Sequence, residues 1–267
     1  MSRTISKFGM ADSSEEIKKN IKCAVDIISN SKQAVVLSGA GISTPSGIPD
    51  FRSTEGGLWT RYDPFEVASL LSFRHHPEKF YDWIRPLAEK MRMAKPNAAH
   101  YGLAQLEQAG YLKTIITQNI DGLHQRAGSK NVIEVHGTLE SMTCVACYEK
   151  VNAEDYIQPY LQKGQVPYCP ACGGILKPDA VLFGEQLPIH SWLKAQKTSK
   201  NCDVMIIAGS SLEVLPVAGL PMRALENGGH LIVINHSETY IDVRADVVFH
   251  ENVIDIIPKI TQGILNG

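Results

Sequence analysis

Four cysteines are grouped so that they could hold one metal ion. Cys144 and Cys147 form one Cys-x-x-Cys pair, Cys169 and Cys172 form another, and 21 residues lie between the pairs. Each pair can supply one side of a tetrahedral zinc site, and four thiolates leave no position open for water. We therefore predict one structural Zn²⁺ ion. A redox-active dithiol is the alternative, but two such pairs at this spacing are better explained by one shared ion.

One histidine has the surroundings of a catalytic base. His136 directly follows the apolar run Val132–Val135 and precedes Gly137, which leaves room for a ligand. Imidazole is the side chain best suited to exchange a proton near neutral pH. Among the nine histidines of the chain, His136 is therefore the candidate base, with a structural role as the alternative.

A glycine-rich segment, Gly39-Ala40-Gly41-Ile42-Ser43, follows the apolar run Ala34–Leu37. Two glycines allow backbone N–H groups to approach a pyrophosphate closely. The segment departs from a dinucleotide-binding fingerprint because Thr44 occupies the sixth position and Pro45 prevents a helix from starting there. A tight turn after a strand is the alternative.

Polar residues follow three further apolar runs. Gln118-Asn119-Ile120-Asp121 could recognise a carboxamide through the asparagine amide, although Asn and Asp also commonly cap a following helix. Gly209-Ser210-Ser211 and Asn235-His236-Ser237 offer small hydroxyl and amide groups that suit phosphate and ribose, with ordinary turns as the alternative.

The segment Lys177–Glu185 has the pattern of an extended chain. Val181 and Phe183 alternate with their neighbours and would lie on one face. Such a segment could pair with a peptide by strand addition, with an ordinary edge strand as the alternative.

The elements that must position these residues form an α/β pattern. Short apolar runs without alternation, separated by helical segments, predict a parallel sheet covered on both faces by helices. The expected strands are 34–37, 113–117, 132–135, 204–208, 231–234 and 247–249. The polar and glycine residues named above follow five of these strands, and ligands bind beyond the carboxyl ends of such strands. A capping box from Ser13 to Glu16 predicts that a helix starts there, after a loose tail over residues 1–12. Further helices are expected within 64–110 and through Ile256, Ile260 and Ile264, and residues 39–57 are expected to form a long functional loop.

Composition is that of an ordinary globular protein. The 267 residues are 44% hydrophobic and 20% charged, and the net charge is −2. This balance does not imply nucleic-acid binding, and no apolar run approaches the ~18 residues of a membrane-spanning helix. The first residues lack the apolar segment of a secretory signal, so a cytoplasmic protein is expected, and translation could start at Met1 or at Met10.

Taken together, these motifs resemble those of the sirtuins, the NAD-dependent protein lysine deacylases. The matching strings occur in the family's order between residues 39 and 237, and the likeness covers roughly 12–265. They are Gly39-Ala40-Gly41-Ile42-Ser43, Gly47-Ile48-Pro49-Asp50-Phe51-Arg52, Thr117-Gln118-Asn119-Ile120-Asp121, His136-Gly137, the four cysteines, Phe183-Gly184-Glu185 and Gly209-Ser210-Ser211. The short tails are typical of a compact, prokaryote-like member.

The resemblance implies a fold and a set of roles. It implies a Rossmann-like NAD-binding large domain over 12–44, 96–137 and 179–267, a cofactor-binding loop and helical module over 45–95, and a zinc-ribbon module over 138–178. It gives catalytic roles to His136, Asn119 and Asp121. Cofactor contacts would come from Gly39, Ala40, Gly41, Ser43, Asp50, Phe51, Arg52, Gln118, Asn119, Ile120, Asp121, Gly209, Ser210, Ser211, Asn235, His236, Ser237 and Val253. Substrate contacts would come from Val181, Phe183, Gly184, Glu185, Val214 and Leu215.

The implied reaction is NAD-dependent removal of acetyl groups from lysine side chains of a protein or peptide. Its products would be free lysine, nicotinamide and O-acetyl-ADP-ribose, with His136 as the base toward a ribose hydroxyl. Sirtuins that remove succinyl or malonyl groups carry a Tyr-x-x-Arg pair. Here Tyr81 is followed by Ile84 at the arginine position, and Arg85 lies one residue later, about 100° around a helix. This departure favours a neutral acyl group, acetyl first.

Three other functions remain open at this point. Mono-ADP-ribosyl transfer would use the same cofactor. A catalytically idle NAD or ADP-ribose sensor would not need His136 together with Asn119 and Asp121. A dehydrogenase is disfavoured by the broken glycine fingerprint and by the lack of a candidate acid for hydride transfer.

Overall fold

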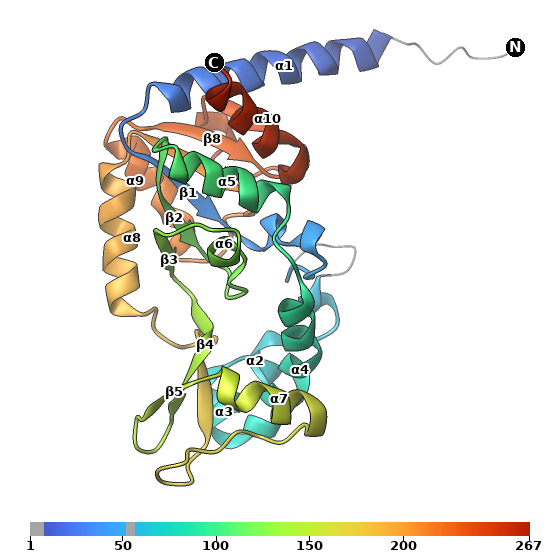
Figure 1. Ribbon diagram of the computed structural model, residues 1–267, viewed down its shortest axis with the longest axis vertical. Coiled ribbons are helices and arrows are strands. Elements are labelled where there is room, and N and C mark those ends of the chain that lie inside the picture. Colours follow the sequence, from blue (N-terminus) through green and yellow to red (C-terminus); the bar gives the residue numbers. More distant parts are fainter. Residues whose placement is uncertain (1–7, 52–56) are drawn as a thin grey trace, which may run out of the picture.

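The larger part of the molecule is built on a six-stranded sheet (Figure 1). The computed structural model describes residues 8–51 and 57–267. The strands lie in the order β3-β2-β1-β7-β8-β9, and every neighbouring pair is parallel. Their bounds are β1 Ala34–Ser38, β2 Leu112–Thr117, β3 Val132–Glu134, β7 Val204–Ala208, β8 His230–Ile234 and β9 Val247–Phe249. The predicted parallel sheet is therefore confirmed, strand by strand.

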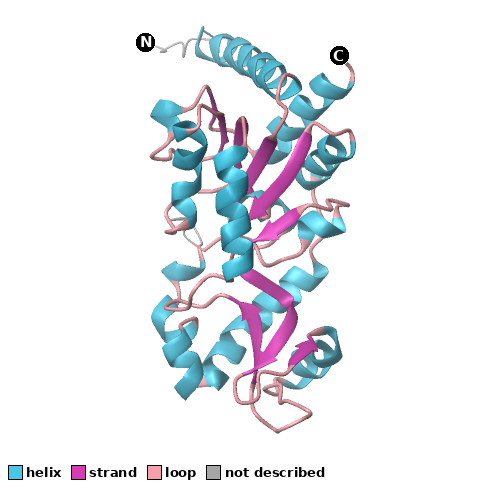
Figure 2. Cartoon of the chain, turned by 90° about the vertical axis from the view of Figure 1, so that its left-hand side faces the viewer, coloured by secondary structure: helices cyan, strands magenta, loops and turns pink. Residues whose placement is uncertain are grey.

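Helices cover both faces of this sheet (Figure 2). Helices α1 (Phe8–Ser29), α5 (Ala98–Gln108) and α10 (Val253–Leu265) pack on one face, and α8 (Ile189–Asn201) and α9 (Leu220–Glu226) pack on the other. Alternate residues of the central strands enter the two cores: Val36 lies in the first core, and Val35 and Leu37 lie in the second. Burial on both faces explains why these strands are apolar runs without alternation.

The predicted start of the first helix was wrong. Helix α1 begins at Phe8, so Ser13 lies inside the helix and does not cap it, and the loose tail does not extend to residue 12. The residues from Met10 to Ser13 continue the helix because nothing between them and Ser29 breaks it, as a proline or glycine would. Among the described residues, no helix combines the length and apolar character needed to cross a membrane.

The smaller part of the molecule combines short helices with a three-stranded antiparallel sheet. Its helices are α2 (Pro64–Val67), α3 (Leu70–His75), α4 (Pro77–Met93) and α7 (Glu154–Lys163), and its strands are β4 (Gly137–Cys144), β5 (Lys150–Asn152) and β6 (Leu176–Ala180). Phe73, Phe80 and Tyr81 form a core that also takes in Tyr160 of α7. The cysteine-containing segment therefore packs against the helices of this lower region (Figure 1).

Short helical turns connect these elements. They are η1 (Ala40–Ile42), η2 (Thr44–Ser46), η3 (Leu58–Thr60), α6 (Leu123–Arg126), η4 (Val217–Gly219) and η5 (Asp242–Arg244). Because Pro45 lies in η2, the glycine-rich segment leads into single 3-10 turns and not into an α-helix, as the sequence predicts.

The order of the strands creates one crevice at the sheet's carboxyl edge. The chain runs outward from β1 through β2 to β3, then crosses back to place β7 on the other side of β1. Ligands bind at such a switch point. Two glycine loops meet here, since the Gly41 N–H donates to the Gly209 carbonyl at 2.9 Å. A Cβ at Gly209 would lie 2.2 Å from the Ile42 nitrogen, and the φ of Gly209 is +61°.

This close approach gives a stability prediction. Gly209→Ala forces the two loops apart and places a side chain in the left-handed region, so we expect the free energy of unfolding to fall by about 3 kcal/mol. Urea denaturation followed by circular dichroism measures it. Gly219→Ala is the control, because nothing lies within 4 Å of a Cβ there, and it should change stability by less than about 1 kcal/mol. Equal effects of the two variants would contradict the packing argument.

Candidate active site

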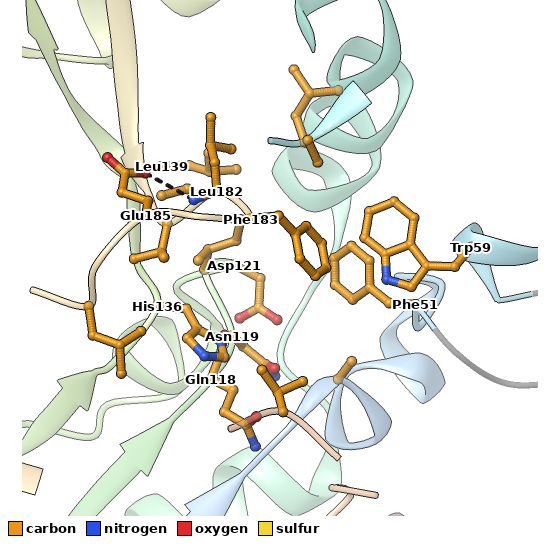
Figure 3. A pocket seen from close by; sticks show the side chains of 18 of the residues that line it. Phe51, Trp59, Gln118, Asn119, Asp121, His136, Leu139, Leu182, Phe183 and Glu185 are labelled. Atoms are coloured by element: carbon orange, nitrogen blue, oxygen red, sulfur yellow. Dashed lines mark hydrogen bonds between the residues drawn. The ribbon is translucent and has the colours of Figure 1, made fainter. Parts of the chain in front are cut away.

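A cavity of about 640 Å³ opens beyond the carboxyl ends of β1 and β2. Figure 3 shows His136, Asn119 and Asp121 pointing into it, with Gln118 beside them and the rings of Phe51, Trp59 and Phe183 across the cavity. Of the predicted site residues, the cavity brings together Ala40, Ser43, Phe51, Gln118, Asn119, Ile120, Asp121, His136, Val181, Phe183, Gly184, Glu185, Val214 and Leu215.

Ser43 links the amide and the carboxylate of the polar end. The Asn119 amide Nδ2 donates to Ser43 Oγ at 3.1 Å and to the Gly39 carbonyl at 3.1 Å, and Ser43 Oγ donates to Asp121 Oδ2 at 2.7 Å. Burial raises the pKa of the Asp121 carboxyl, whereas hydrogen bonds from Leu123 N–H and Ser43 oppose that rise. Asp121 therefore accepts a hydrogen bond from the Leu123 N–H at the start of α6, as expected for an aspartate before a helix, and it also lines the cavity. These bonds fix both side chains before any ligand arrives.

His136 is oriented by a backbone carbonyl. Its Nδ1 lies 3.2 Å from the oxygen of Gln118, the residue that follows β2. Because a carbonyl can only accept, Nδ1 must carry the proton in the neutral ring, and Nε2 then carries the lone pair. The arrangement selects the tautomer that a base needs.

The remaining predicted cofactor residues lie outside this cavity, and most of them follow neighbouring strands. Gln118 Nε2 donates to Ser210 Oγ at 2.9 Å, which joins the end of β2 to the loop after β7. Asn235 follows β8, is buried, and donates to the Ser237 carbonyl at 2.7 Å. The others outside the cavity are Gly39, Gly41, Asp50, Gly209, Ser211, His236, Ser237 and Val253, and Arg52 lies outside the described residues. The adjacent strands β1, β7 and β8 thus place the groups that directly follow them on one edge of the sheet, whereas Asp50 lies in the loop after η2 and Val253 starts α10.

The cavity wall that faces the strand ends is apolar and comes from the smaller part of the molecule. Trp59 stacks on Trp83 with ring centroids 5.6 Å apart, and Phe183 contacts Trp59 edge-on at 5.8 Å. The sequence reasoning did not single out this wall, to which Ile48, Trp59, Ala68, Phe80, Trp83, Met91 and Leu139 contribute. The spacing of Phe80, Trp83, Ile84 and Met91 on one helix could have indicated a shared face.

The residues compared with the Tyr-x-x-Arg pair do not form one. Ile84 lines the cavity, but Tyr81 is buried and its hydroxyl donates to the Leu176 carbonyl. Arg85 Nη1 lies toward α7, 2.4 Å from where a Cβ on Gly164 would be. The cavity wall at this position is therefore uncharged.

Residues 181–183 connect the two parts of the molecule. The Val181 N–H donates to the His136 carbonyl at 2.8 Å, and the Phe183 N–H donates to the Ala68 carbonyl at 2.9 Å. The Leu70 N–H in turn donates to the Phe183 carbonyl at 3.0 Å. The predicted extended chain is present, although β6 itself ends at Ala180 and Phe183 forms an isolated bridge with Ser69.

The four predicted metal ligands meet at the far end of the small sheet. Cys144, Cys147, Cys169 and Cys172 have their Sγ atoms within 4.8 Å of one another, and the closest pairs are 3.5 and 3.6 Å apart. A tetrahedral zinc ion with Zn–S bonds of about 2.3 Å requires sulfur atoms about 3.8 Å apart, so the donor set fits Zn²⁺. Four thiolates would fill the coordination sphere and leave the ion a structural role.

Comparison with known proteins agrees with this geometry. The model of the Sir2 family matches residues 39–216. The chain belongs to the Sir2 family. An NAD-dependent protein deacylase 2 of Archaeoglobus fulgidus is 42% identical over 93% of this chain and 97% of its own length. An NAD-dependent protein deacetylase 2 of Caldanaerobacter subterraneus is 46% identical over 88% of this chain and 92% of its own. A Sir2 structure with p53 peptide and NAD⁺ superimposes with a TM-score of 0.84 at 40% identity, covering 92% of this chain and 99% of the other.

Two buried histidines lie behind the active site of this Sir2 protein. His124 Nε2 is 2.9 Å from Ser38 Oγ, and Ser38 donates to Thr117 Oγ1, which also accepts from the Asn119 N–H. The His100 ring lies 4.9 Å from that of His124. Burial lowers the pKa of His100 to about 4, and burial together with the nearby His100 lowers that of His124 to about 3. Both rings are therefore neutral at neutral pH.

These shifts predict a loss of stability in mild acid. The unfolded chain binds protons at an imidazole pKa of 6.5, whereas the buried rings resist protonation until about pH 4 and 3. The free energy of unfolding should fall as the pH drops from about 6.5 toward 4, by up to about 1.4 kcal/mol per pH unit for each ring. Urea unfolding at a series of pH values measures this slope. His124→Gln should reduce the slope, and because the carboxyl groups are common to both proteins, an unchanged slope would refute the assignment.

Proposed function

We propose that this protein removes acetyl groups from lysine side chains of proteins or peptides in an NAD-dependent reaction, giving deacetylated lysine, nicotinamide and O-acetyl-ADP-ribose. The observation that carries the proposal is His136, held by the Gln118 carbonyl as a base, in one cavity with Asn119 and Asp121. Membership of the Sir2 family, with relatives named NAD-dependent deacetylases over most of both chains, supports it.

Two groups of polar residues along the sheet edge would bind different parts of the cofactor. Asn119 and Asp121 would face the nicotinamide, with Ser43 fixing both. Ser210, Ser211, Asn235 and Ser237 would face the phosphates and the adenine ribose, with Ser210 and Asn235 buried and Ser237 exposed. NAD supplies an activated ribose carbon with nicotinamide as leaving group. A cytoplasmic location and a division into domains at the predicted bounds stay predictions.

Side chains of the protein have two roles in the reaction: an apolar wall limits the access of water, and His136 accepts a proton. The apolar wall with Trp59, Trp83 and Phe183 keeps water from the ribose carbon, where it would compete with the acetyl oxygen. One water molecule is consumed later, when the lysine amine leaves the acetyl carbon. His136 Nε2 would take the proton of a ribose hydroxyl, and the Gln118 carbonyl stabilises the imidazolium that forms. Residues 181–185 would lie along the substrate backbone, and pairing with it by strand addition would fall to Gly184, because the N–H groups of its neighbours already have partners.

Replacing the base gives the first functional test. His136→Ala should lower kcat for deacetylation of an acetyl-lysine peptide at least about a hundredfold, because it removes general-base catalysis. The variant should keep the wild-type melting temperature. Mass spectrometry of the peptide with and without NAD measures turnover. His75→Ala, on the exposed surface of α3, is the control and should be fully active. Wild-type turnover by His136→Ala would rule out the proposed mechanism.

The uncharged wall predicts an acyl preference. An acetyl-lysine peptide should be consumed with a kcat/KM about a hundredfold higher than the matching succinyl peptide, since the described residues that line the cavity beside Ile84 offer a buried carboxylate no lysine or arginine. The same assay should give nicotinamide and O-acetyl-ADP-ribose in equal amounts. Comparable rates for the two peptides would show that a cation reaches the acyl group. Transfer of labelled ADP-ribose onto protein without deacetylation would replace the proposed function.

A further inference from the structure

Lys177, which does not line the cavity, contacts the segment that leads into the predicted substrate-binding residues 181–185. Lys177 lies in β6 with only 12% of its side chain exposed. Its Nζ donates to the Pro178 carbonyl at 2.8 Å and to the Ala180 carbonyl at 2.9 Å. It also forms an ion pair with Glu185 Oε2 at 3.1 Å. Lys177 faces a second cleft, of about 810 Å³, and not the cavity that contains His136.

Glu185 closes the turn that follows β6. Its Oε2 accepts from the Leu182 N–H at 3.0 Å, the contact drawn as a dashed line in Figure 3, and its own N–H donates to the Leu182 carbonyl at 3.0 Å. The carboxylate therefore binds the backbone of the turn and the ammonium of Lys177 at once. Such charge-assisted contacts hold a turn in one conformation.

The turn that Glu185 closes belongs to a segment that contacts both parts of the molecule and lines the cavity. Val181 bonds to the backbone of His136, Phe183 bonds to Ala68, and residues 181–185 all line the cavity. A shift of this segment would displace the surface along which a peptide pairs and the opening through which an acyl-lysine enters. Small displacements of such a surface lower productive binding strongly.

We infer that Lys177 is a positioning residue for the acyl-lysine peptide, acting through its ion pair with Glu185. The inference rests on the proposed function for its substrate. The Lys177 ammonium bonds to no residue of the polar end, where Asn119 and Asp121 lie, so its removal affects the peptide side of the site before the cofactor side. Without the Lys177 ammonium, the Glu185 carboxylate loses its ion pair, and the carbonyls of Pro178 and Ala180 lose a hydrogen-bond donor.

The test compares Lys177→Met with a matched loss of charge in the same cleft. Lys150→Met is the control, because Lys150, in β5, pairs at 3.0 Å with Asp179 of β6, outside the turn that Glu185 closes. We expect Lys177→Met to raise KM for an acetyl-lysine peptide about tenfold while KM for NAD changes less than about twofold. Lys177→Arg keeps a charged donor and should stay within about threefold of wild type.

Hydrogen exchange provides a readout independent of turnover. Mass spectrometry should show faster amide exchange over residues 181–185 in Lys177→Met, and wild-type exchange there in Lys150→Met. Glu185→Gln keeps the size of the side chain and removes the charge, so it replaces Lys177→Met if that variant fails to fold.

The outcomes separate the two proposals. A wild-type protein that does not deacetylate the peptide would refute the proposed function, and the exchange data would still decide whether Lys177 holds the turn. An active wild type, with peptide KM and exchange the same in Lys177→Met and Lys150→Met, would overturn the role of Lys177. Equal increases in the KM values for peptide and NAD would also overturn it, because they would indicate a general structural defect.

Discussion

The backbone hydrogen bonds of residues 181–183 are the constraint on which the site depends. Val181 is bonded to His136 in the sheet region, and Phe183 is bonded to Ala68 in the helical region. These bonds add to the side-chain contacts by which Ile120, after β2, already packs against the core that contains the apolar wall. Main-chain bonds and side-chain packing thus place the polar strand ends and the apolar wall around one cavity, which limits the access of water to the reacting groups.

The polar groups of the cavity are fixed by partners that a ligand need not displace. Asn119 and Asp121 share Ser43, and His136 is oriented by a carbonyl of the neighbouring strand end. Behind them, Thr117, Ser38 and the buried imidazole of His124 continue the bonding into the core. Preorganisation of this kind removes the need to reorder side chains during binding.

Much of the fold and of the polar site was predictable from the sequence, for identifiable reasons. Strands such as Val204–Ala208 are buried on both faces and so appear as uninterrupted apolar runs, and the polar residues after them share one sheet edge because the strands are parallel. The four cysteines converge as their spacing predicted. The wall with Trp59 and Trp83 was missed because apolar side chains that line a cavity have the same pattern as those that fill a core. The start of α1 was missed because a favourable capping sequence does not require a helix to begin there.

The origin of the apolar wall has an evolutionary consequence. Phe80, Trp83 and Ile84 come from one helix, α4, whereas Asn119, Asp121 and His136 follow strands of the large sheet. Selection can therefore alter the size and charge of that helix face while leaving the machinery that activates the ribose untouched. New acyl specificities can arise in such a scaffold by drift on a single helix, without an intermediate that has lost its chemistry.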